Sequence, residues 1–270
     1  MHAIWAILIE FLLRLTFGMA VAMGLTPARW VTSGFFRVHL WVLMGINTFA
    51  ALWLYSQRAA VDVISPGLGM WLVGLAIASA VISYVGAVIW MYEQNGAGKT
   101  AIGLVAASAG LGCWLISGAG MKSSLPIGQW LLLQLDWLPG SLVIGGVTTA
   151  MLLGHWYLNS PGMRMEPLYR LLLLIFFALA LRGLWSGAGL AAEVLHRTAD
   201  HAPTTQFWLF VALRWLAGIF GPAALTWLTW LTLKIPNTQS ATGILYAGVI
   251  LVFIGELTSR LMSMTTLFPI

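Results

Sequence analysis

The fold is decided by stretches such as residues 68–92, which read LGMWLVGLAIASAVISYVGAVIWMY. This segment contains no charged residue, and about 20 mostly apolar residues suffice to cross the hydrocarbon core of a bilayer as an α-helix. Seven further stretches are similarly long and mostly apolar. The sequence therefore predicts an all-α integral membrane protein with about eight transmembrane helices, at residues 4–24, 34–56, 68–92, 100–120, 129–157, 167–191, 206–233 and 241–263.

The composition agrees with a polytopic membrane protein. Hydrophobic residues make up 60% of the 270 positions and charged residues only 8%, which excludes a soluble globular domain. We expect a single membrane domain over residues 1–270, arranged as two four-helix bundles, with Pro139-Gly140 and Gly221-Pro222 kinking the two longest segments. Residues 68–92 and 100–120 are rich in Ala, Gly and Ser, which predicts close packing between those two helices.

Charge and cysteine content narrow the function further. The net charge of +5 reflects a shortage of acidic residues rather than a basic run, so the sequence gives no support for nucleic-acid binding. The chain has one cysteine, Cys113, and therefore cannot hold a thiolate-ligated iron–sulfur cluster by itself.

The charges of the loops predict the orientation. Connections on one side carry six basic residues, and those on the other side carry three, Arg58, Lys122 and Arg197. By the positive-inside rule the side with more basic residues is cytoplasmic. We therefore expect the protein in the inner (cytoplasmic) membrane of the cell, with both termini outside the cytoplasm. The six basic residues of the richer side are Arg29, Arg37, Lys99, Arg164, Arg170 and Lys234.

Six charged residues lie inside the predicted spans, between the membrane midplane and the outer face. An ionisable group at this depth is costly unless it is paired or faces a cavity, so its default interpretation is functional. Two pairs are spaced i,i+4 on one helix face, and Asp136 and Glu193 are candidate partners for the two arginines that have no local acid. The six residues are Glu10, Arg14, Arg182, Arg214, Glu256 and Arg260.

These residues admit more than one interpretation. They can form internal ion pairs that hold helices together, or a basic pocket in the outer leaflet. Such a pocket could bind a quinone carbonyl, with an acid, Glu256 or Glu10, exchanging protons and with Arg260, Arg214, Arg182 and Arg14 orienting the head group. The same arginines could instead conduct a small anion, as in a transporter or channel.

Two histidines allow a separate interpretation. His39 and His155 are expected at similar depth near the cytoplasmic ends of their segments. Two histidines on facing helices could ligate a haem b, or either residue could serve in proton entry. The spacing does not favour haem, and we expect no protein-bound metal site.

Short motifs give the chain a resemblance to one family. The closing helix contains Gly255-Glu256-Leu257-Thr258-Ser259-Arg260, and residues 40–45 read LWVLMG. With eight spans and Leu152-Leu153-Gly154, the chain resembles the membrane anchor subunits of dimethyl sulfoxide reductase and polysulfide reductase, the NrfD-like type. Ser259 stands where that family has the second glycine of Gly-Glu-x-x-Gly-Arg, and the histidine often found just after the second helix is missing.

The resemblance implies a function. Anchors of this type exchange electrons between a membrane quinone, ubiquinone or menaquinone, and iron–sulfur clusters of a partner subunit that serves a catalytic subunit. We therefore expect a quinone-interacting anchor subunit of a multi-subunit respiratory oxidoreductase, not catalytic alone. The alternatives are a small-anion transporter or channel, a haem b protein, and a purely structural subunit.

Overall fold

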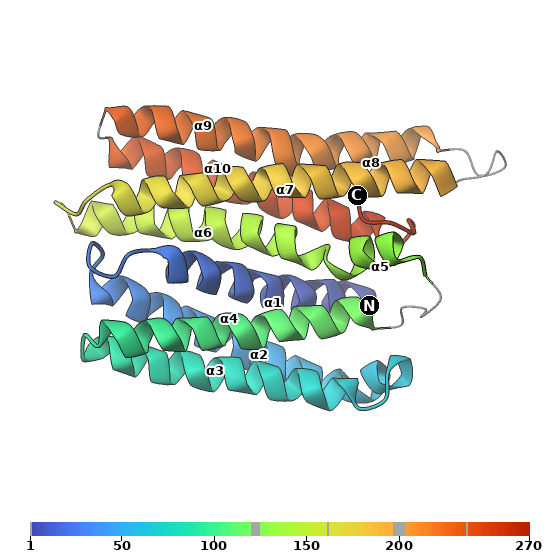
Figure 1. Ribbon diagram of the computed structural model, residues 1–270, viewed down its shortest axis with the longest axis horizontal. Coiled ribbons are helices and arrows are strands. Elements are labelled where there is room, and N and C mark those ends of the chain that lie inside the picture. The colour runs from blue at the N-terminus through green and yellow to red at the C-terminus, as the bar shows by residue number, and fades with distance from the viewer. Residues whose placement is uncertain (1, 120–124, 161, 197–202, 236) are drawn as a thin grey trace. The chain divides into compact units, whose positions relative to one another are not determined.

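The chain is almost entirely helical. The computed structural model describes residues 2–119, 125–160, 162–196, 203–235 and 237–270, and no strand occurs among them (Figure 1). Eight helical segments in this part of the chain are long and apolar enough to cross a membrane, as the sequence predicted. Their length and apolarity indicate an integral membrane protein. Lys122 and Arg197, which entered the prediction of orientation, lie outside the described residues.

The chain divides into two compact units, which we describe separately. Unit 1 comprises Met1–Ser123 and Gly162–Leu171. Its helices are α1 (His2–Leu25), α2 (Ser33–Ile64), α3 (Leu68–Met91), α4 (Asn95–Gly118) and the first residues of α7 (Glu166–His196).

The small residues of α3 and α4 bring these two helices together, as predicted. The hydroxyl groups of Ser79 and Ser108 are hydrogen-bonded across the helix pair at 2.7 Å. A Cβ added to Gly86 would lie 3.0 Å from the Cβ of Ala101, so the backbones approach closely at this level. Close approach through small side chains is how membrane helices gain packing energy when lipid and side chains are equally apolar.

Two boundaries in unit 1 differ from the prediction. Helix α2 continues to Ile64 rather than ending near residue 56, because the first strong helix breaker is Pro66, which forces Ser65 out of the helical region. The N–H of Gly69 then donates to the carboxylate of Asp62 at 2.7 Å, which closes the turn. Helix α4 begins at Asn95 instead of residue 100, and its Lys99 donates to the carbonyl oxygens of Met23 and Gly24, both at 2.8 Å.

Unit 2 comprises Ser124–Pro161 and Leu172–Ile270. It contains the remainder of α7 together with the C-terminal helices. Its other elements are α5 (Ile127–Gln134), α6 (Trp137–Asn159), α8 (Thr205–Trp215), the π-helical turn η2 (Leu216–Phe220), α9 (Gly221–Lys234) and α10 (Thr238–Met262).

The two predicted kinks lie in unit 2, and both follow from proline. Pro139 has no N–H to offer the carbonyl of Leu135, and that carbonyl instead accepts from Leu138 at 3.0 Å, so α5 and α6 are separate helices. Pro222 likewise cannot donate to Gly218, and the chain forms a π turn in which the Gly221 N–H reaches the carbonyl of Leu216. Figure 1 shows α9 continuing from α8 after this turn.

Two close contacts fix the end of unit 2 that carries most of the predicted site. Gly218 of η2 meets Gly255 of α10 so closely that a Cβ on Gly255 would lie 2.1 Å from the Cα of Gly218. The segment after α10 folds back along α7, where the carbonyl oxygen of Pro269 occupies the space that a side chain at Gly189 would need. Phe268 and Ile270 are buried as a result.

Candidate functional site: a buried arginine–carboxylate cluster

In unit 2, four of the six predicted charged residues lie close to one another. One of the two predicted acidic partners, Asp136, lies with them. Arg182 lies on α7, Arg214 at the end of α8, and Glu256 and Arg260 on the last turns of α10. Asp136 sits in the break between α5 and α6, where Pro139 interrupts the helix. We call Asp136, Arg182, Arg214, Glu256 and Arg260 the arginine–carboxylate cluster.

Arg182 is the centre of the cluster and is fully buried. Its Nε and Nη2 donate to the two carboxylate oxygens of Glu256 at 2.9 and 3.1 Å, which is a bidentate pair. Its Nη1 donates to Asp136 at 2.5 Å, and Nη2 also reaches the hydroxyl of Ser259 at 3.1 Å. Arg182 therefore connects α7 to both α10 and the α5–α6 break.

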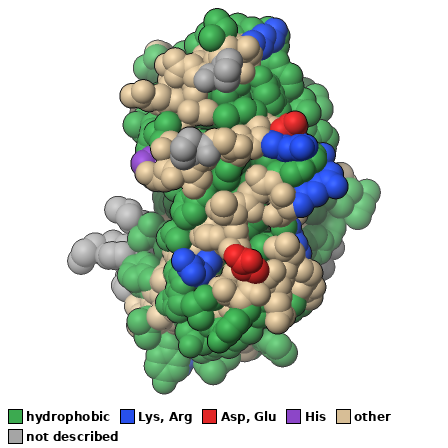
Figure 2. Space-filling view, turned by 90° about the vertical axis from the view of Figure 1, so that its left-hand side faces the viewer, with side chains coloured by type: hydrophobic (Ala, Val, Ile, Leu, Met, Phe, Trp, Pro, Cys, Tyr) green, Lys and Arg blue, Asp and Glu red, His purple; other side chains and the backbone are tan. Residues whose placement is uncertain are grey.

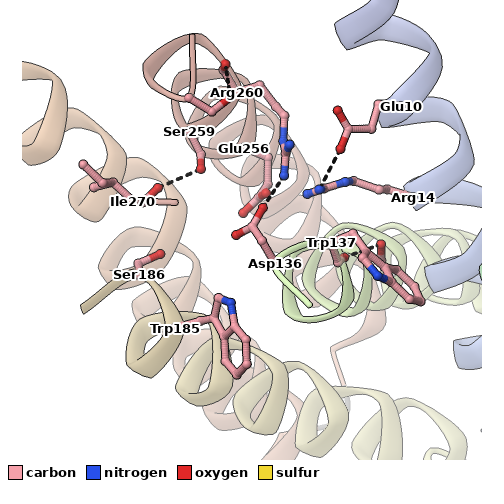
Figure 3. A network of polar contacts seen from close by, with 12 residues as sticks. Glu10, Arg14, Asp136, Trp137, Trp185, Ser186, Glu256, Ser259, Arg260 and Ile270 are labelled. Carbon is pink, nitrogen blue, oxygen red and sulfur yellow. Dashed lines mark hydrogen bonds and ion pairs between the residues drawn. The ribbon is translucent and has the colours of Figure 1, made fainter. Parts of the chain in front are cut away.

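Asp136 and Glu256 each bind a second arginine. Arg260 donates to the other carboxylate oxygen of Asp136, a contact visible in Figure 3. Arg214 Nη2 donates to Glu256 at 2.9 Å. Glu256 and Arg260 were predicted as i,i+4 partners, but in the structure these two residues extend to α6, α7 and α8, so the cluster joins helices across the unit.

Arg214 contacts Glu256, Ser186 and Ile270 and keeps one guanidinium nitrogen without a hydrogen bond in the described residues. Its Nη2 lies 3.5 Å from the hydroxyl of Ser186, and its Nε donates to the backbone oxygen of Ile270 at 3.3 Å. Its Nη1 is buried and makes no hydrogen bond within the described residues; it packs against Gly218, where a Cβ would lie 1.8 Å away. The neighbouring Trp215 likewise has a buried indole N–H without a hydrogen bond in the described part of the chain.

Ser259 and Ile270 belong to the site but were not predicted. The Ser259 hydroxyl donates to the backbone oxygen of Ile270 at 2.7 Å (Figure 3), so this oxygen accepts from both Ser259 and Arg214. The sequence signal for Ser259 was its place in the closing motif, where the resembling family has glycine. Nothing in the sequence indicated that the segment after α10 would return to the cluster.

Glu193 contacts the segment that follows α10. It was one of two candidate partners for the buried arginines, and the other, Asp136, binds Arg182. The carboxylate of Glu193 accepts the backbone N–H groups of Leu267 at 2.8 Å and Phe268 at 3.1 Å. It therefore holds the segment after α10 in its folded-back position.

The arginine–carboxylate cluster has more positively charged than negatively charged side chains. It contains three guanidinium groups and two carboxylates, so its five side chains sum to one positive charge. Arg182 and Arg214 are both 0% exposed. The oxygen of Ile270, which accepts from Arg214 and Ser259, already meets this positive charge in the structure.

A cavity of about 420 Å³ lies beside the cluster, between α8 and α10. Its walls include Met262 and Phe207, which pack with Val211 and Ile270 in one apolar layer. The backbone oxygen of Ile270 contacts Arg214. The apolar layer therefore separates the cavity from the donors of the cluster. The lining residues are Thr204, Gln206, Phe207, Phe210, Leu261, Met262 and Thr265.

The remaining two predicted charges form a pair in unit 1. Arg14 Nη2 lies 2.8 Å from Glu10 Oε1, which confirms the predicted i,i+4 partnership on α1. The Arg14 side chain is 2% exposed and that of Glu10 is 17% exposed, so the carboxylate is the more accessible member. Whether this pair joins the quinone site stays a prediction.

The two histidines belong to different units. His39 on α2 is buried, with Nδ1 2.5 Å from the carbonyl oxygen of Phe35 and its ring packed on the Phe35 ring. His155 on α6 is exposed, and its Nδ1 lies 3.5 Å from the hydroxyl of Tyr246. Their proposed role in haem binding or proton entry stays a prediction. Within the described residues no group of three or more His, Cys, Asp and Glu could hold a metal ion.

Comparison with known proteins adds no assignment: no protein-family model, curated protein or solved structure matches this chain.

Proposed function

We propose that the chain is a quinone-interacting membrane anchor subunit of a respiratory oxidoreductase, set in the inner membrane as two four-helix bundles with both termini outside the cytoplasm. In this proposal an iron–sulfur subunit and a catalytic subunit dock on the outer side. The support is the arginine–carboxylate cluster together with the resemblance of residues 255–260 to the closing motif of such anchors.

The observation that carries the proposal is a pair of neighbouring buried N–H donors that have no acceptor in the described part of the chain. Arg214 Nη1 and Trp215 Nε1 have no acceptor among the described residues, and Arg214 Nε and Ser259 Oγ share one backbone oxygen, that of Ile270. Buried donors normally find acceptors, so an exception calls for a ligand. A quinone carries two carbonyl oxygens on a flat apolar ring, and each carbonyl oxygen can accept from such donors.

The cavity offers the ring and tail of a quinone a place on the other side of the apolar layer from these donors. Its volume of about 420 Å³ falls within the size of small-molecule sites, about 300–1,000 Å³, and its walls combine apolar side chains with Thr204, Gln206 and Thr265. To bring a carbonyl to Arg214 and Ser259, the Ile270 oxygen must yield its position. We propose that the segment held by Glu193 moves aside when the head group enters.

A bound quinone supplies two-electron, two-proton chemistry, interconverting quinone and quinol with a partner iron–sulfur cluster as the other electron carrier. The residues of this chain bind and orient it. Arg214 and Ser259 donate to the carbonyl oxygen, and the positive charge of Arg214 stabilises negative charge on that oxygen. Glu256, which binds Arg182 and Arg214, is the acid proposed to exchange protons with it.

The test uses quenching of the intrinsic tryptophan fluorescence by decylubiquinone, measured on the purified full chain in detergent. Replacing Ser259 by alanine removes one neutral donor, worth about 0.5–1.5 kcal/mol, and should weaken quinone binding about two- to tenfold. Thr258→Ala is the matched control, because the Thr258 hydroxyl donates only to the Ile254 carbonyl of its own helix at 2.8 Å. Equal binding by both variants and the parent chain would overturn the assignment of the site.

A purely structural role is the second candidate, and the hydrogen bonding of Arg182 favours it. Four hydrogen bonds from one guanidinium to Asp136, Glu256 and Ser259 suffice to hold three elements together without any ligand. Pulling the chain from native membranes in mild detergent distinguishes the two. Iron–sulfur and catalytic subunits should co-purify with an anchor, whereas a chain that comes out alone and binds no decylubiquinone would contradict the quinone proposal.

A further inference from the structure

Three arginines surround one tryptophan at an end of unit 1. Trp30 lies in the connection between α1 and α2, and the guanidinium carbons of Arg29, Arg170 and Arg164 lie 4.4, 4.9 and 5.7 Å from the centroid of its ring. The three arginines are exposed and Trp30 is half-buried. They come from two distant stretches, since Arg164 precedes α7 and Arg170 lies in its first turns.

Cation–π contact with one ring does not offset the positive charges of Arg29 and Arg170. The groups are closer together than the Debye length of about 10 Å, so they repel one another even in salt. Arg29 and Arg170 make no ion pair within the described residues, and Glu166, four residues before Arg170, makes none with it. A group of cations gathered around one aromatic ring is what an anionic ligand requires.

The position of Trp30 and the three arginines at the ends of the spans indicates what kind of ligand they would bind. Trp30 and Arg29 follow the span Ala6–Leu25 and precede the span that starts at Ser33, while Arg170 lies at the start of the span from Glu166. Tryptophan and arginine at span ends lie at the level of lipid head groups. Figure 2 shows Lys and Arg side chains exposed beside hydrophobic ones on the face at this end of the helices.

We propose that Trp30, Arg29, Arg164 and Arg170 form a binding site for the head group of an anionic phospholipid with two phosphates, of the cardiolipin class. Guanidinium groups bind phosphate oxygens in bidentate fashion, and basic pockets at the cytoplasmic ends of membrane helices suit such head groups. A single phosphodiester would neutralise one of the two charges of Arg29 and Arg170, whereas a two-phosphate lipid neutralises both. The bound lipid would hold the α1–α2 connection against the start of α7. This site is independent of the proposed quinone function.

Native mass spectrometry of the full chain, released from nanodiscs that contain cardiolipin and phosphatidylcholine, tests the proposal. The parent chain should retain cardiolipin in preference to phosphatidylcholine. The double variant Arg29→Gln/Arg170→Gln should lose about tenfold or more in cardiolipin occupancy, since each basic residue near a membrane surface contributes about fivefold. A single variant, Trp30→Leu, tests the ring and should reduce retention in the same direction.

The control is Arg58→Gln, because Arg58 also stacks on an aromatic ring, 4.1 Å from the centroid of Tyr55, but as a single cation. Its cardiolipin occupancy should equal that of the parent chain. Inorganic phosphate at millimolar concentration should not displace the lipid. Equal retention of the two lipids, an equal loss in Arg58→Gln, or displacement by phosphate alone would overturn the assignment of a lipid site.

Discussion

Replacing Arg182 by methionine should destabilise unit 2 more than any other single change in the cluster. Methionine keeps much of the side-chain volume but removes four hydrogen bonds, three of them to the carboxylates of Asp136 and Glu256. Breaking a buried ion pair by removing one partner costs about 3–5 kcal/mol, because a carboxylate is left buried without its compensating charge. Each carboxylate keeps one other arginine, Arg260 or Arg214, so we expect a loss within that range rather than above it.

Unfolding of the purified chain in mixed micelles of dodecyl maltoside and increasing dodecyl sulfate, followed by far-ultraviolet circular dichroism, measures this loss. Arg58→Met is the reference variant, because Arg58 is only half-buried and contacts a tyrosine, and its free energy of unfolding should change by less than about 0.5 kcal/mol. Arg182→Lys should fall between the two, since an ammonium group cannot make the bidentate pair. A loss below about 1 kcal/mol in Arg182→Met would refute the view that Arg182 holds the helices of unit 2 together.

Two further predictions concern the contacts around the cluster. Gly255→Ala should destabilise the chain by about 1–3 kcal/mol in the same micelle assay, because its Cβ would lie 2.1 Å from the Cα of Gly218 and force η2 and α10 apart. The control is Gly243→Ala on the same helix. It should change the free energy of unfolding little, because nothing lies within 4 Å of the added Cβ. Glu193→Gln should weaken the hold on the segment that follows α10, and limited proteolysis should then cleave that segment faster; unchanged cleavage would contradict the role assigned to Glu193.

The sequence predicts the helical architecture because length and apolarity are properties of single segments. Eight spans, their order and the proline interruptions at Pro139 and Pro222 all follow from local composition and the missing proline N–H. Helix ends were predicted less well. Polar residues such as Asp62 remain helical when no breaker intervenes, so α2 extends to Ile64 although its apolar run ends earlier.

The contents of the site could be predicted only in part. The depth of Arg182, Arg214 and Glu256 is visible in the sequence, because each lies a countable number of turns from a span end. The rotation of each helix is not visible, and rotation decides which carboxylate meets which arginine. The return of Ile270 to Ser259 depends on packing between distant segments, which no local pattern encodes.

We assign stability mainly to Arg182 and ligand binding to Arg214 and Ser259. This assignment allows the structural role and the quinone-binding role to be tested separately. Arg182 uses four of its five N–H donors on protein partners and contributes mainly to holding helices together. Arg214 keeps one buried nitrogen without a hydrogen-bond partner in the described residues and shares the Ile270 oxygen with Ser259. If the cluster were structural alone, changes at Arg182 and Ser259 would both act on unfolding in proportion to the hydrogen bonds removed. A ligand site instead requires that Ser259→Ala lower quinone affinity relative to Thr258→Ala, in addition to any loss of stability that follows from its hydrogen bonds to Ile270 and Arg182.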